Sequence, residues 1–159
     1  MAQITQHLWF AADMRAALDF YTGVIPRSRL EWTSSLPIET PSGPPGSVHL
    51  AGFWLGDQRY QAIEAGPLDA FNHSFSIMVE CDDQAELDRI WEAFLADGAA
   101  TEQCGWLRDR WGVSWQIVPK RLGELMSDPD VEVQKRVGAA FMQMVKFDIA
   151  ALEAAAKSG

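Results

Sequence analysis

An internal duplication constrains the fold of this chain more than any other feature of its sequence. The segments Asp13–Asp19 and Asp82–Asp88 share the pattern D-x-x-A-x-L-D. Each segment follows a strand-like run, residues 4–10 in the first copy and 75–79 in the second. Because self-similarity on this scale marks a repeated structural unit, the sequence predicts two copies of one small module.

An amphipathic helix is expected in each copy. Apolar residues at helical spacing give the second copy the stripe Leu87, Ile90, Trp91, Phe94 and Leu95, and the first copy the stripe Met14, Ala17, Leu18 and Tyr21. Asp13 is expected to cap the first helix, and Asp82 or Asp83 the second. Gly98 is placed to end the second helix.

Short extended runs follow each predicted helix. They cover residues 29–34, 47–54 and 59–64 in the first copy, and 100–107 and 113–118 in the second. The turn residues Gly56-Asp57 and Trp111-Gly112 separate adjacent runs, as in hairpins. The sequence therefore predicts an α+β fold with two βαβββ modules, about 3–66 and 72–120, in one domain.

The pattern changes after Pro119. Apolar residues again recur at helical spacing, and Asp148 can cap a further short helix. We therefore expect a C-terminal helical tail over residues 128–157. Its apolar stripe must be covered either by the domain's own sheet or by a second subunit.

Composition and charge narrow the setting. The 159 residues suit one domain, and no basic start or long apolar run suggests export or membrane insertion. The two cysteines, Cys81 and Cys104, are expected to be packed thiols, so a reducing, cytoplasmic location is predicted. The net charge of −9 would repel nucleic acid and anionic lipid, and neither is an expected partner.

The two modules and the run Cys-Gly-Trp-Leu-Arg-Asp-Arg-Trp-Gly-Val-Ser-Trp-Gln-Ile-Val-Pro at 104–119 resemble the vicinal oxygen chelate superfamily. That superfamily includes glyoxalase I, bleomycin-resistance proteins and extradiol dioxygenases. Segments 18–22, 71–79 and 148–154 are similar to its PhnB-like branch, and the resemblance extends over nearly the whole chain. It implies a glyoxalase-like curved mixed sheet.

Members of this branch are often named 3-demethylubiquinone-9 3-methyltransferase. A methyltransferase of the usual kind holds its nucleotide-like cofactor with a glycine-rich turn between a strand and a helix. The sequence contains no G-x-G-x-G motif. We therefore do not expect the methyltransferase name to describe the activity.

The resemblance also implies where a site would lie, because metal-dependent members place ligands from both modules in a half-open cavity. The corresponding positions here are Gln6, Ala62 or Glu64, Ser74 or His73, and Gln116. His7 lies one residue from the first position and would face the other side of its strand. Glutamine amides are poor metal ligands, so we expect no bound metal and expect Gln6 and Gln116 to face one another and orient a polar ligand.

Three functions stay open from the sequence. The first is binding of a small molecule in a metal-free cavity that Trp9, Trp54, Trp106 and Trp115 line or back, although these indoles could simply fill the core. The second is a metal-dependent lyase, isomerase or dioxygenase that uses Glu64 and His73. The third is metal-free acid–base catalysis by Glu64 or His73. A homodimer is expected by analogy with the family and because the tail's stripe needs covering.

Overall fold

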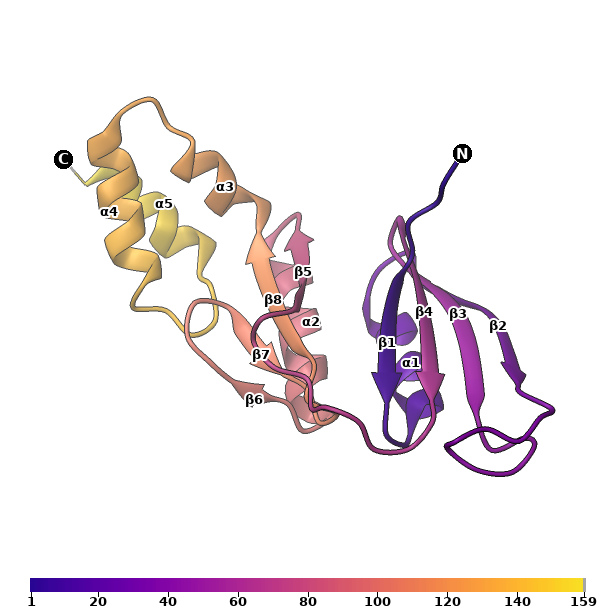
Figure 1. Ribbon diagram of the computed structural model, residues 1–159. Helices are drawn as coiled ribbons and strands as arrows, with labels where there is room; N and C mark the ends of the chain where they lie inside the picture. The colour runs from indigo at the N-terminus through magenta and orange to yellow at the C-terminus, as the bar shows by residue number, and fades with distance from the viewer. Residues whose placement is uncertain (159) are drawn as a thin grey trace. The chain divides into compact units, whose positions relative to one another are not determined.

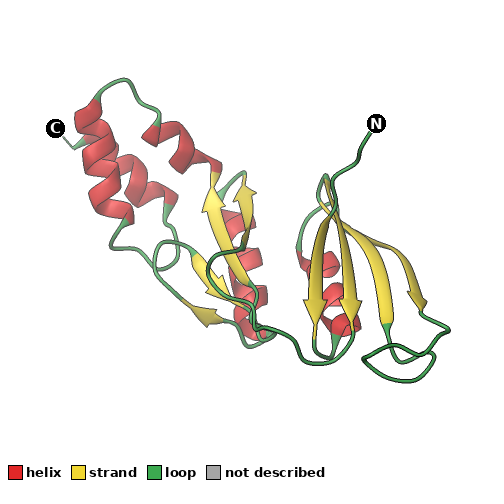
Figure 2. Cartoon of the chain, viewed as in Figure 1, coloured by secondary structure: helices red, strands yellow, loops and turns green. Residues whose placement is uncertain are grey.

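The computed structural model describes residues 1–158 and forms two compact units, Met1–Ala70 and the remainder from Phe71 (Figures 1 and 2). Each unit holds one four-stranded mixed sheet and one copy of the predicted module. The predicted α+β architecture with two βαβββ modules and a C-terminal helical tail is confirmed. The division at residue 70 falls between the two predicted modules.

The first unit contains β1 (Gln6–Phe10), α1 (Met14–Val24), β2 (Arg29–Ser35), β3 (His49–Leu55) and β4 (Gln58–Glu64). The strand order is β1-β4-β3-β2, with β1 parallel to β4 and the other pairs antiparallel. The β3–β4 hairpin turns at Gly56-Asp57, as predicted, and Gly56 has a φ of 57°.

Helix α1 covers one face of this sheet (Figure 2). Strand side chains alternate between faces, so Leu8 and Phe10 point to the same side as their partners on β4. They are buried together with the predicted apolar stripe of α1. The other face of the sheet has no helix of this unit on it among the described residues, and we call it the first open face.

The N-terminus of α1 is held in an unexpected way. Asp13 occupies the predicted cap position, but its φ is 58° and its side chain makes no cap hydrogen bond to any described residue. Instead, Glu64 Oε2 at the end of β4 accepts a hydrogen bond of 2.8 Å from the Met14 backbone N–H. A carboxylate there pairs an otherwise unsatisfied N–H and complements the positive end of the helix.

The second unit contains β5 (Ser76–Cys81), α2 (Gln84–Ala96), β6 (Ala100–Thr101), β7 (Trp106–Arg108) and β8 (Ser114–Pro119), in the order β5-β8-β7-β6. The single predicted run 100–107 is thus two short strands. Cys104 and Gly105 turn the chain between them with φ values of 57° and 79°. Asp83 caps α2 by accepting a hydrogen bond from the Glu86 N–H, as predicted.

A buried carboxylate organises the turn between β7 and β8. Asp109 is only 5% exposed and accepts hydrogen bonds from the backbone N–H groups of Trp111 and Val113 and from Trp115 Nε1. The Trp115 ring is thereby held 5.0 Å from the ring of Phe94 on α2, measured between centroids. This network accounts structurally for much of the 104–119 run.

The helical tail consists of α3 (Lys120–Met126), α4 (Val131–Phe141) and α5 (Ile149–Lys157). It begins directly after β8, earlier than the predicted residue 128. The most deeply buried tail residues are Val137, Phe147 and Leu152. The tail's own helices and the rest of the second unit therefore cover the apolar stripe only in part, since Val137 is buried but Val145 is 38% exposed, and the homodimer stays a prediction.

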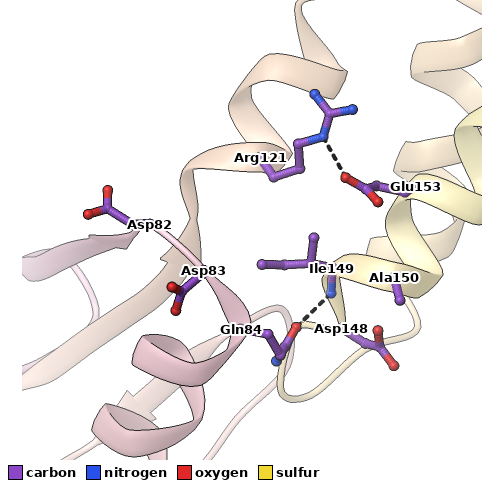
Figure 3. Close-up of a pocket in the computed structure, with 8 residues that line it drawn as sticks. All are labelled: Asp82, Asp83, Gln84, Arg121, Asp148, Ile149, Ala150 and Glu153. Carbon is purple, nitrogen blue, oxygen red and sulfur yellow. Dashed lines mark hydrogen bonds and ion pairs between the residues drawn. The ribbon is translucent and has the colours of Figure 1, made fainter.

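The tail is joined to the second module by backbone and side-chain hydrogen bonds. Gly105 N–H donates to the Val145 carbonyl at 2.7 Å, and a Cβ on Gly105 would lie 2.4 Å from the Phe147 ring. Gln84 donates to the Phe147 carbonyl. Gln84 also accepts from the Ile149 N–H (Figure 3). Gly105 is therefore the residue whose missing side chain lets the tail dock.

A cavity of about 390 Å³ lies at this junction (Figure 3). Arg121 and Glu153 face each other across part of its wall at 2.9 Å. Asp83 and Asp148, which also line it, cap the helices α2 and α5. The polar side chains named here are therefore engaged in an ion pair and in helix caps within the protein. Over residues 1–158, no helix has the length and apolar character needed to cross a bilayer.

Candidate functional site

The first open face carries an aromatic surface. Trp9, Trp32 and Trp54 lie on it, on three different strands. The indole of Trp32 lies directly over Gly52, since a Cβ there would be 2.2 Å from Trp32 Nε1. Only a glycine gives that indole room to lie against the sheet. We call Trp9, Trp32 and Trp54 the tryptophan surface.

A row of polar donors crosses the same face. Arg29, Trp54 and Arg59 are cross-strand neighbours on β2, β3 and β4, and Arg29 Cζ lies 4.9 Å from the centroid of the Trp54 ring. Trp54 Nε1 and Arg59 Nε are buried and have no hydrogen-bond partner within residues 1–158. Buried donors are rarely left unpaired, so these two indicate a partner from outside the chain, a water or a ligand.

Strand parity separates two residues that the sequence analysis put in one cavity. Gln6 and Trp9 are three residues apart on β1 and therefore point to opposite faces. Gln6 shares the α1-covered face with Leu8, whereas His7 shares the first open face with Trp9. A single open face can hold His7 and Trp9, or Gln6, but not all three.

Glu64 lies on the face that α1 covers. It pairs across β4 with Phe10 of β1 and directs Oε2 to the helix N-terminus, as described above. The hydrogen bond between Glu64 and the Met14 N–H therefore has a structural role, that of a helix cap. A catalytic or metal-binding role for this residue stays a prediction.

The face of the second sheet away from α2 gathers several predicted residues. Gln116 Nε2 donates to Ser76 Oγ at 2.9 Å, and Trp106 is the cross-strand partner of Gln116. His73 Nε2 lies 2.8 Å from Glu102 Oε2, and the His73 ring centroid lies 6.1 Å from that of Trp106. Gln6 and Gln116 belong to different units, and their facing one another stays a prediction.

Glu102 is the residue that sequence reasoning missed. It lies in the turn between β6 and β7, which the sequence analysis interpreted as part of one strand, and it is 29 positions from its partner His73. A break in the run at Gln103-Cys104-Gly105 is the signal that could have placed it in a turn.

Trp115 backs the second sheet and does not line an open face. It is fully buried and packs against Phe94 of α2. Cys81 is also fully buried, and burial raises the pKa of its thiol to about 12, so it stays protonated and unreactive at neutral pH.

The side chains within each unit do not fit a resident divalent metal. Such a site needs at least three imidazole, thiolate or carboxylate ligands, and no group of three of these side chains is placed to hold a metal within residues 1–158. Glu64 Oε2 is engaged by Met14 and His73 Nε2 by Glu102.

Comparison with known proteins gives the family. The family described as 3-demethylubiquinone-9 3-methyltransferase matches residues 2–118. A PhnB protein from Bacillus cereus is 28% identical, with a TM-score of 0.64 over 74% of this chain and 99% of that one. Protein PA1353 from Pseudomonas aeruginosa is 24% identical, with a TM-score of 0.58 over 75% and 98% of the two chains.

The fold is shared more widely. The fosfomycin resistance protein FosX from Mesorhizobium loti has a TM-score of 0.53 and 16% identity over 72% of this chain and 87% of that one. A comparison with curated proteins finds no match.

These matches correct the extent of the resemblance. The family match ends at residue 118, so α3, α4 and α5 lie beyond it, including the segment 148–154 that seemed to support the assignment. The similarity to the family therefore lies in the two modules. The chain belongs to the 3-demethylubiquinone-9 3-methyltransferase family, the PhnB-like branch of the vicinal oxygen chelate superfamily.

Proposed function

We propose that this protein binds a small, flat organic molecule on the tryptophan surface of the first open face, without a bound metal. One observation carries this proposal. Three indoles share that face with two buried donors, Trp54 Nε1 and Arg59 Nε, which have no partner among the described residues.

The chemistry of the surface favours a ligand with an aromatic or apolar body and an oxygen acceptor. Indole rings offer large, rigid contact areas for stacking. An acceptor atom near the row Arg29, Trp54 and Arg59 would satisfy the unpaired donors. Arg59 also lies 3.9 Å from the Glu31 carboxylate, so the Arg29 guanidinium is the group that favours a carboxylate or enolate there. We therefore propose an aromatic acid as the class of ligand.

The family name supplies no activity here. The chain lacks the glycine-rich turn of a nucleotide-like cofactor site, and one fold can carry many functions. Methyl transfer is not part of the proposal. A cytoplasmic location and a homodimer belong to it.

A second function has one observation in its favour. The His73 imidazole is 2.8 Å from the Glu102 carboxylate, an arrangement that orients the ring. This pair could transfer a proton to or from a substrate that stacks on Trp106. A metal-dependent reaction, the other alternative, would need ligands in addition to Glu64 and His73.

Tryptophan fluorescence would test the main proposal. Titration with an aromatic carboxylate such as 2-naphthoate should quench the emission saturably, and Trp54→Leu should weaken binding about tenfold or more by removing stacking and one donor. Trp91→Phe, which alters a buried indole on α2, is the matched control and should leave affinity unchanged. Equal affinity in wild type and Trp54→Leu would overturn the proposal.

Elemental analysis of protein purified without chelator separates the alternatives. We expect less than a tenth of an equivalent of any transition metal, as an order of magnitude for a protein with no resident site. About one equivalent of metal, lost on His73→Ala, would favour the metal-dependent reaction. A proton-transfer activity abolished by His73→Ala and by Glu102→Gln would favour the acid–base pair.

A further inference from the structure

A second cavity, of about 330 Å³, lies where the tail meets the face of the second sheet away from α2, which we call the outer face. Its floor is formed by Met78 of β5 and Val118 of β8, and its walls by Leu122 and Met126 of α3 and Phe141 of α4. Met78 is 51% exposed although it is a large apolar side chain. The volume is within the range of small-molecule sites, and methionines adapt their shape to what they contact.

The charged side chains around this cavity do not balance one another. Two ionisable side chains line it, Glu80 of β5 and Lys120 of α3. Lys120 forms an exposed ion pair with Asp82 and also interacts electrostatically with Glu80. Glu80 is exposed, and no cation within residues 1–158 lies at ion-pair distance from it. Two carboxylates, Glu80 and Asp82, thus share one ammonium group, and the apolar walls are combined with a net negative charge at this edge of the cavity.

We propose that this cavity binds a small apolar cation, a hydrophobic amine or quaternary ammonium whose charge meets Glu80 and whose body contacts Met78, Met126 and Phe141. The net charge of −9 favours the approach of cations. The walls come from α3 and α4, which lie beyond the family match, whereas Met78, Glu80 and Val118 lie within it, so the site exists only where the tail meets the second module. It is independent of the tryptophan surface and does not rest on the proposed function.

The test uses the whole chain and benzyltrimethylammonium as the probe. Methyl resonances of ¹³C-labelled methionine, assigned by Met78→Leu and Met126→Leu, should shift saturably for those two residues. Benzenesulfonate, a similar ring with the opposite charge, should bind at least tenfold more weakly. Equal affinity for both probes would overturn the inference, as would shifts confined to methionines outside the cavity.

Two variants locate the binding. Glu80→Gln should weaken the cation about fivefold, the value of a partly exposed charge pair. Gly123→Leu should abolish binding, because Gly123 lines the cavity and a Cβ there meets no described atom within 4 Å, so the new side chain can fill the space. Gly138→Leu in α4 is the matched control, since it also meets no described atom but lies outside the cavity.

The helix should tolerate Gly123→Leu, since leucine favours helix more than glycine does. Unchanged circular dichroism with lost binding supports the site. Retained binding in Gly123→Leu, or equal loss in Gly138→Leu, would overturn it. Because the readout uses methionine methyl groups of the second unit, failure here leaves the tryptophan surface untouched.

Discussion

The two modules repeat the same architecture but differ in how their helices are anchored and in what covers their sheets. In the first, β4 supplies Glu64 to hold the start of α1, and the first open face displays indoles. In the second, Asp83 of the local turn caps α2, and helices α3 and α4 lie along part of the outer face. The duplicated part is the helix-facing core, and the chemistry diverges on the opposite faces.

The largest expected effect contrasts two tryptophans. Trp115→Ala should lower the free energy of unfolding by about 3–5 kcal/mol, because it empties a fully buried site and leaves Asp109 short of a donor. Trp54→Ala should cost about 1–2 kcal/mol, since that indole is only half-buried. Urea unfolding measures both. Equal losses would show that the tryptophan surface is core and would break the contrast.

Two glycines with similar backbone conformations sharpen the comparison. Gly105 and Gly66 have φ values of 79° and 84°, so alanine is strained at both by about 1 kcal/mol. At Gly105 the new Cβ would also meet the Phe147 ring and the Ile117 carbonyl, which raises the expected loss to about 3 kcal/mol. At Gly66 it meets no described atom.

The measurement is thermal or urea unfolding of Gly105→Ala beside Gly66→Ala. In Gly105→Ala, hydrogen exchange should also speed up in the tail, because the Cys104 and Gly105 N–H bonds to the Met144 and Val145 carbonyls depend on the same approach. If the tail stays as protected as in wild type, Gly105 does not control its docking.

The next comparison is between the two residues that cap α1 and α2. Glu64→Ala should cost about 1 kcal/mol by leaving the Met14 N–H unpaired, and Asp83→Ala should cost a similar amount at α2. Glu64→Gln, which keeps an acceptor oxygen, should recover part of the loss. If Glu64→Gln abolishes an activity while stability is kept, then Glu64 has a chemical role beyond the cap.

The sequence predicted where the helices and strands lie better than it predicted which face of a sheet each strand side chain points to. Helical spacing and turn residues located both modules, and Asp83 and Asp148 cap the helices as expected. The direction of β1 side chains depends on which alternate residues pack under α1, and an isolated run with His7 and Trp9 on one side does not reveal it. Placing Gln6 by analogy therefore grouped it with Trp9, which points to the opposite face of β1.

Contacts distant in sequence explain the other omissions. The His73–Glu102 pair joins two turns, and Glu64 reaches a helix 50 positions away. Nothing in local spacing encodes either contact. The pattern after Pro119 did indicate helices, but only the packing of Val137 and Leu152 shows which tail residues the chain itself buries.

The smallest expected effect compares two surface ion pairs, one on each module's helix. Lys146 and then Gln84 hydrogen-bond to Asp88 on α2 and hold the pKa of its carboxyl below the ordinary value of 3.8. A lowered pKa stabilises the folded state above the unfolded-state pKa, and this contribution disappears as pH falls through the lower folded-state value. Asp88→Asn should therefore cost under about 1 kcal/mol at pH 7, and the difference from wild type should shrink as the pH falls below 3.8. The matched change is Asp19→Asn on α1, which breaks a more exposed pair with Arg15 and holds no tail in place.

Urea unfolding across this pH range should show a smaller loss for Asp19→Asn. A loss for Asp88→Asn that does not shrink as the pH falls would contradict a charge effect, because asparagine keeps an oxygen that can accept the hydrogen bond from Gln84.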